Sequence, residues 1–205
     1  MSLTLISAPA VQPVTLADLK LQLGLSPMED TDPVKSEQLS RQLRRLIAVA
    51  TRECESITNT AFITQTWKWE FDGWPRVDSR YERPGYHAIR LPLPPYQSMV
   101  SFTCIGMDGI SQAVTEYQVD AGGGTKPARI IRPYLQPWPI LRAVPNNVAL
   151  EFICGYGDSP DNVPETIKQA IVFLAQFYYE NGAVTDLPIP RVINSLLAKE
   201  TNWIS

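Results

Sequence analysis

The sequence LSRQLRRLIAVATRECESI occupies residues 39–57 and repeats apolar side chains at steps of three and four residues. Such spacing places the apolar side chains on one face of an α-helix, while arginines fill the other faces. Pro33 suits the first turn of this helix, because a proline there loses no hydrogen bond. We therefore predict a long amphipathic helix over residues 33–57.

Shorter helical patterns lie on both sides of this segment. Thr15 and Asp18 have the spacing of a capping box and predict a helix over residues 16–23. A second apolar stripe predicts a helix over residues 164–181, which Gly182 ends. A short amphipathic helix is expected at residues 192–199.

The period changes to two residues after the long helix. Trp67, Trp69 and Phe71 alternate with charged side chains, which predicts a strand over residues 64–72. The pair Asp108-Gly109 is typical of a hairpin turn. Further short strands are expected at residues 87–91, 99–105, 116–120, 129–132 and 147–155. The layout is helix, helix, β-rich middle, helix and short helix, so the predicted fold class is α+β.

Composition limits the function classes. The chain has 205 residues, 44% of them apolar, and a formal net charge of −3. This apolar content excludes wholesale disorder, and the negative balance argues against a dedicated DNA-binding surface. No run approaches the roughly 18 apolar residues of a membrane span. Residues 1–14 lack the charged and apolar regions of a signal peptide, so we expect neither a membrane span nor a signal peptide.

Side chains that could carry catalysis are sparse. His87 is the only histidine, and no G-x-S-x-G or H-E-x-x-H motif accompanies it. The glycine-rich segment Gly122–Lys126 lacks the spacing of a phosphate-binding loop and precedes a strand, so we interpret it as a connection between strands. Cys54, Cys104 and Cys154 form no C-x-x-C pair and fit reduced, packed cysteines of a cytosolic product. We therefore predict no enzyme activity and no catalytic, cofactor-binding or metal-binding residues.

Aromatic and basic side chains alternate over residues 67–90. Such a mixture can stack on bases and contact phosphates. Trp67 and Trp69 share one strand face, which is typical of a core, while Arg76, Arg80 and Arg83 lie in the following loop. A nucleic-acid-binding module that uses this stretch is the alternative function.

Large apolar side chains stand near the end of the sequence. Leu196 and Leu197 precede Trp203 and Ile204. A terminal tryptophan either docks on its own domain or anchors a partner, because tryptophan is enriched at interface hot spots. The residues alone leave both readings open.

Several segments together resemble the head–tail connector proteins (adaptor or head-completion proteins) of long-tailed phages, prophages and gene transfer agents. The segments are PVTLADLK (residues 13–20), residues 46–57, AFITQTW (61–67), RLPLPP (90–95), and CGYG (154–157) leading into VPETIKQAI (163–171). The resemblance implies a small α-helical bundle with a β-rich insertion between the second and third long helices. We therefore expect the bundle in residues 1–61 and 158–205 and the insertion in residues 62–157.

The resemblance also implies a structural role in the virion neck, after assembly in the cytoplasm of a bacterial host. Twelve copies would form a ring under the portal protein, extend the DNA channel and offer a platform to the next neck or tail-completion protein. DNA would pass without specific binding, and no membrane would take part. In relatives the C-terminal segment engages the portal, so Leu196, Leu197, Trp203 and Ile204 become candidate portal contacts. Arginines that could meet neighbouring subunits, the neck or the DNA channel are Arg41, Arg45, Arg76, Arg80 and Arg83.

Overall fold

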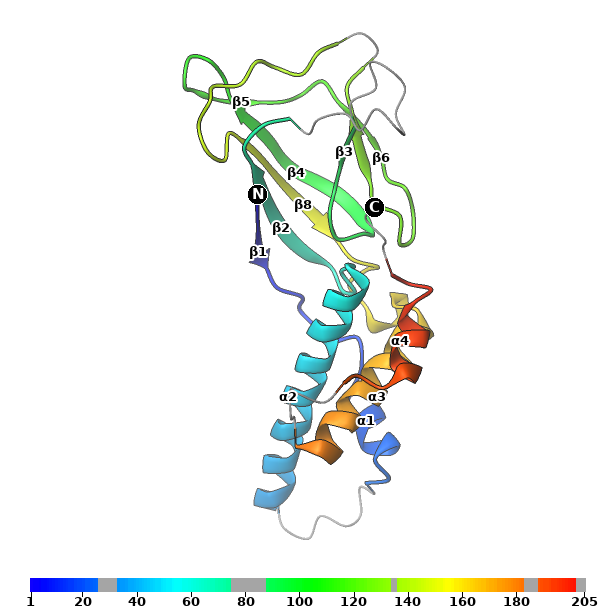
Figure 1. Cartoon of the computed structure of the whole chain (residues 1–205). Helices are drawn as coiled ribbons and strands as arrows, with labels where there is room; N and C mark the ends of the chain where they lie inside the picture. The colour runs from blue at the N-terminus through cyan, green and yellow to red at the C-terminus, as the bar shows by residue number, and fades with distance from the viewer. Residues whose placement is uncertain (26–32, 75–87, 134–135, 183–187, 202–205) are drawn as a thin grey trace. The chain divides into compact units, whose positions relative to one another are not determined.

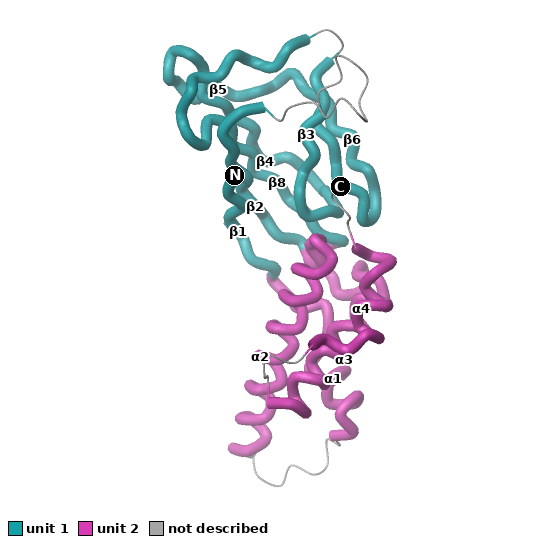
Figure 2. Tube along the Cα trace, viewed as in Figure 1, with its two compact units in different colours: residues 1–9, 64–156, 204–205 teal, residues 10–63, 157–203 magenta. Residues whose placement is uncertain are grey.

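The computed structural model describes residues 1–25, 33–74, 88–133, 136–182 and 188–201. The fold class is mixed α+β, as the sequence predicts. Contacts divide the described chain into two compact units, shown in different colours in Figure 2. Of the described residues, the sheet unit contains Met1–Pro9 and those within Thr64–Tyr156, and the helical unit contains those within Ala10–Ile63 and residues 157–201. Whether residues 62–157 fold as an independent insertion stays a prediction.

Four α-helices form the helical unit (Figure 1). They are α1 (Leu16–Gln22), α2 (Pro33–Thr58), α3 (Glu165–Asn181) and α4 (Arg191–Leu197), with a short 3₁₀ helix, η1, at Pro160–Asn162. All four predicted helices are confirmed to within about two residues at each end. α2 packs along α3, α1 packs against both, and α4 packs mainly against α3. The fully buried side chains include Leu19, Leu43, Ala50, Cys54, Ile167, Ile171, Leu174 and Leu197.

Local signals set the helix ends. The side chain of Thr15 accepts a hydrogen bond from the Asp18 N–H at 3.2 Å, and the Asp18 carboxylate accepts one from the Thr15 N–H at 2.9 Å. This is the predicted capping box, and it satisfies two N–H groups that the helix itself leaves unpaired. Gly182 ends α3 with φ of 69°, a left-handed conformation that glycine adopts without a Cβ clash.

Two antiparallel sheets form the sheet unit. The larger has the order β1-β2-β8-β4-β5, and the smaller has the order β3-β7-β6. The strands of the larger sheet are β1 (Ser2–Ser7), β2 (Gln65–Phe71), β8 (Val148–Cys154), β4 (Tyr96–Ile105) and β5 (Ser111–Ala113). Those of the smaller sheet are β3 (Ala88–Arg90), β6 (Gln118–Asp120) and β7 (Arg129–Ile131). Buried and half-buried side chains alternate along central β8, because one face of the sheet covers the core.

The predicted strands are all present, and two further strands were not expected. β1 pairs with β2 at the edge of the larger sheet, although the sequence analysis assigned residues 1–61 to the bundle. The Asp108-Gly109 turn does form a hairpin, and Gly109 has φ of 80°. Its second strand is β5, however, and not the expected strand near residue 116. Within the described residues, no helix combines the length and apolarity that a membrane crossing requires.

Candidate partner-binding surfaces

The glycine-rich segment Gly122–Lys126 is the turn of a hairpin between β6 and β7, as predicted. Asp120 accepts a hydrogen bond from the Gly122 N–H at 3.2 Å and forms an ion pair with Arg129 across the hairpin. The hydrogen bond from Arg129 lowers the pKa of the Asp120 carboxyl. A strand follows the turn, so the segment lacks the helix N-terminus on which a phosphate-binding loop depends.

The three cysteines are buried in the two units and form no disulfide, as expected. Burial raises the pKa of Cys54 to about 12, and the nearby Glu53 and Glu55 carboxylates add to the rise. A thiol at such a pKa carries almost no thiolate near neutral pH and serves packing. The described residues contain no group of three or more histidine, cysteine or acidic side chains placed to hold a metal ion.

The described aromatic side chains of residues 67–74 belong to the sheet unit. Trp67 stands between Leu5 of β1 and Phe152 of β8 in the strand register. The Trp69 ring lies 4.5 Å from that of Phe71. These rings help build the sheet and do not form an exposed series for bases. The other members of the predicted stretch, including Arg76, Arg80, Arg83 and His87, lie outside the described residues.

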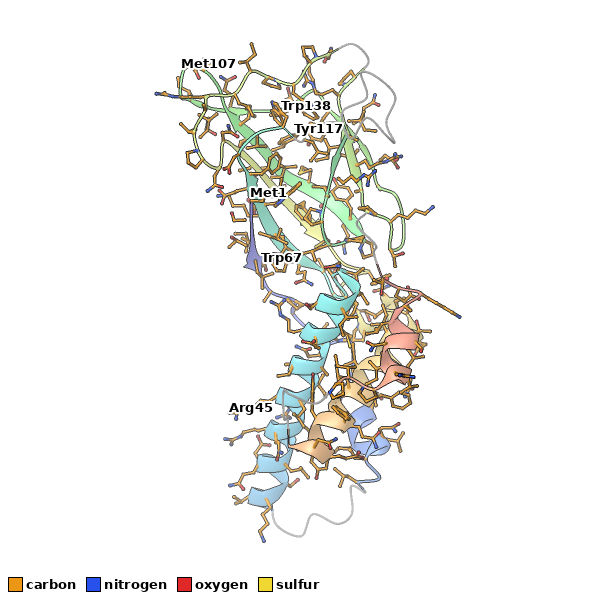
Figure 3. The ribbon with its side chains drawn as sticks, viewed as in Figure 1. Met1, Arg45, Trp67, Met107, Tyr117 and Trp138 are labelled. Carbon is orange, nitrogen blue, oxygen red and sulfur yellow. The ribbon has the colours of Figure 1, made fainter. Side chains whose placement is uncertain are left out.

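A second aromatic cluster joins the loops of the sheet unit (Figure 3). Trp138 and Tyr117 of this cluster are labelled in Figure 3. The rings of Trp74 and Trp138 stack with their centroids 4.6 Å apart, and the Trp74 indole N–H donates to the Pro139 carbonyl at 2.7 Å. The Phe102 ring makes T-shaped contacts with both Trp74 and Tyr117. The cluster stabilises the long connections that the prolines keep free of regular structure.

The four candidate portal residues differ in their surroundings. Leu197 is 0% exposed and belongs to the core of the helical unit, whereas Leu196 is half-buried. The Thr201 hydroxyl donates to the Leu197 carbonyl at 2.8 Å. Trp203 and Ile204 lie outside the described residues. Leu197 therefore packs in the core of the helical unit.

The outer face of α2 is basic. Arg41, Arg45, Val49 and Arg52 are exposed and follow one another at helical spacing, and we call this set the α2 stripe. Arg41 pairs with Glu37 at 3.2 Å, and Arg52 pairs with Glu55 at 3.6 Å. Arg45 forms no ion pair within the described residues, and Figure 3 shows it on the outer side of α2. Two residues of the stripe, Arg41 and Arg45, also line a groove of about 490 Å³, together with Gln38, Gln42, Leu46, Tyr178 and Gly182.

An acidic groove of about 620 Å³ lies between α1 and α3. We call it the α1–α3 groove; it is lined by Pro13, Val14, Thr15, Asp18, Leu21, Gln22, Pro160, Asp161, Glu165, Lys168, Gln169 and Val172. The lining contains three carboxylates, those of Asp18, Asp161 and Glu165, and one lysine, Lys168. Lys168 pairs with Glu165 at 2.5 Å. Leu21 is 82% exposed at its edge. Sequence reasoning did not identify this groove, because its charges come from three separate segments.

Solved structures with the same fold are chains of gene transfer agent particles. One chain in the neck of an empty particle, computed with C6 symmetry, matches with a TM-score of 0.74 and 19% identity. Chains of a native virion and of a native neck computed with C12 symmetry match with TM-scores of 0.67 and 0.66, each at 20% identity. Each match covers 100% of this chain and 97% of the other. No protein-family model and no curated protein sequence matches this chain. At these identities the likeness shows a shared fold.

Proposed function

We propose that this chain is a structural protein of the neck of a phage-like particle, with no catalytic role. The observation that carries the proposal is the full-length match to neck chains of gene transfer agent particles. Because the match covers both units, it supports more than a common helical or sheet motif. The proposed location is the virion neck, after assembly in the bacterial host cytoplasm.

The finer proposal is a ring of copies under the portal protein. The C12 symmetry of one matching neck supports twelve copies. Such a ring extends the DNA channel and offers its far side to the next neck or tail-completion protein. The net charge of −3 favours passage of DNA without specific binding, because each neutralised phosphate would add salt-dependent affinity.

The C-terminal segment is the proposed portal contact. Leu196 on α4 is half-buried, so part of its side chain remains accessible. Trp203 and Ile204 follow within a few residues and supply the large apolar side chains that anchor interfaces. The α4 segment is tied to the bundle through buried Ile193 and Leu197.

Mass photometry tests this proposal. The purified chain is measured alone and after mixing with portal rings from the same particle. The expected result is a mass increase of about twelve chains on the portal, the copy number that the C12 neck suggests. No increase at micromolar concentration, with the portal ring intact, would overturn the proposal. Steeply salt-dependent binding to duplex DNA would favour the nucleic-acid-binding alternative instead.

A further inference from the structure

The helical unit carries surfaces of opposite charge. The α2 stripe is basic and the α1–α3 groove is acidic, and no α2 residue lines that groove. Arg41 and Arg45 line a different groove, beside Tyr178 and Gly182 at the end of α3, and Figure 3 shows Arg45 on the outer side of α2. One unit therefore offers two separate and complementary surfaces.

We propose that the α2 stripe of one copy binds the α1–α3 groove of the next copy. The inference rests on the proposed ring and names the surfaces that would build it. A contact between two different surfaces of the same protein is heterologous, and repetition of such a contact closes into a ring when its rotation allows. A contact of α2 with α2 would instead be isologous and would end at a dimer.

The charges select the heterologous arrangement. Arg41 and Arg44 share the Glu37 carboxylate, while Arg45 keeps its charge without a partner in the described residues. In the groove, Asp161 and Glu165 are exposed at a surface that holds one lysine. Two stripes placed together would bring like charges into contact, whereas a stripe on a groove pairs opposite charges.

Apolar side chains accompany the charges on both surfaces. Leu21 is 82% exposed on the groove and Val49 is 54% exposed on the stripe. A contact that covers Leu21 and Val49 buries apolar area inside a rim of ion pairs. This is the usual anatomy of a protein interface. DNA phosphates would also suit the arginines, but they would leave the acidic groove and Leu21 uncovered. A second copy accounts for both surfaces.

Zero-length cross-linking tests the geometry. The variant Arg45→Lys keeps the positive charge and allows a carbodiimide to join position 45 to a carboxylate. Equal amounts of ¹⁴N and ¹⁵N protein are cross-linked at low salt, both free and loaded on portal rings. We expect mixed-isotope peptides that join position 45 to Asp161 or Glu165. Mixed-isotope peptides that join position 45 to Glu37 would indicate an α2–α2 contact, and this result or the absence of any cross-link would overturn the inference.

Charge reversal tests the energetics. Arg41→Glu with Arg45→Glu reverses the stripe, and Asp161→Lys with Glu165→Lys reverses the groove. Each variant alone should load onto portal rings at least about tenfold less than the unmodified chain, because like charges then meet at every contact. In an equimolar mixture, the reversed stripe of one variant can meet the reversed groove of the other, and two normal surfaces meet at the next contact. The mixture should therefore restore loading on a ring with an even number of subunits. Lys126→Glu and Glu180→Lys, which change exposed residues outside both surfaces, serve as matched controls.

The outcomes separate this inference from the proposed function. Normal loading by both reversed variants, or no restoration by the mixture, would overturn the inference and leave the neck proposal standing. Formation of the expected cross-link without loading of the unmodified chain on portal rings would overturn the neck proposal and retain the inference. Loss of duplex DNA binding on stripe reversal, with unchanged loading on portal rings, would assign the stripe to DNA and overturn the inference.

Discussion

At the scale of single residues, Cys54 shows how burial removes a reactive group from function. Its side chain is 0% exposed, and burial raises its pKa to about 12. The thiolate is the nucleophilic form, so the folded protein should react slowly with thiol reagents. We expect none of the three cysteines to be labelled rapidly by dithionitrobenzoate at pH 8, and all three to be labelled in denaturant. Fast native labelling that maps to Cys54 would contradict this assignment.

The same pKa gives a pH dependence with a defined sign. The ordinary pKa of a cysteine is 9.0, so the unfolded chain loses the Cys54 proton first as the pH rises. The folded state then holds more protons, and the free energy of unfolding falls as the pH rises from about 9 towards 12. One such group contributes a loss of up to about 1.4 kcal/mol per pH unit in this window. Urea denaturation at pH 8 and 10 measures it, and Cys54→Ala should reduce the pH dependence.

At the scale of elements, the packing of α4 distinguishes two neighbouring leucines. Leu197 is fully buried and Leu196 is half-buried. Leu197→Ala should lower the free energy of unfolding by about 2–5 kcal/mol, because it removes buried methyl groups and leaves a cavity. Leu196→Ala should cost less than about 1 kcal/mol. Urea denaturation followed by circular dichroism compares the two, and equal losses would mean that α4 packs in another orientation.

The N-terminal strand leads to a further prediction for the larger sheet. β1 pairs with β2 through the register Leu3–Trp69 and Leu5–Trp67. Deletion of residues 2–7 leaves β2 at the sheet edge, so the β2 amides that donate to β1 should lose protection from hydrogen exchange. The amides between β2 and β8 should keep it, as should β2 in the control Ile6→Ser, which changes a side chain that is 52% exposed. Unchanged protection throughout β2 would show that β1 adds no stability to the sheet.

The sequence predicted the elements with strong local signals. The capping box at Thr15, the helical stripe of α2 and the alternation around Trp67 each act within a few residues. β1 and β5 were missed for different reasons. β5 reads SQA and has neither a β-branched nor an aromatic side chain, and β1 is fixed by a partner some sixty residues away. Strand order is non-local too, since β8 lies between β2 and β4.

The candidate surfaces also differ in how far local sequence patterns predict them. The basic stripe of α2 follows from helical periodicity, so Arg41 and Arg45 could be selected from the sequence. The burial of Leu197 could not be separated from that of Leu196 without the packing of α4 on α3. The α1–α3 groove depends on tertiary structure alone, because Asp18, Asp161 and Glu165 have no common sequence pattern.

At the scale of the whole molecule, the neck proposal makes the C-terminal segment a binding element and not a stabilising one. Thr201 closes the end of α4 through its hydrogen bond to the Leu197 carbonyl, so a deletion that starts after it preserves that bond. Removal of residues 202–205 should therefore leave the melting temperature of the isolated chain within about 2 °C of its original value. The same deletion should weaken binding to portal rings.

Trp203→Ala in the full chain is the sharper form of this test. If Trp203 fills a pocket of the portal as an interface anchor, its loss should weaken portal binding at least about 30-fold, since hot-spot residues contribute 2 kcal/mol or more. Lys199→Ala, on an exposed side chain nearby, serves as the control and should change portal binding little. A large drop in the melting temperature of the isolated chain would instead mean that Trp203 packs on its own helical unit. The portal would then have to be held by other residues, and half-buried Leu196 would be the next to change.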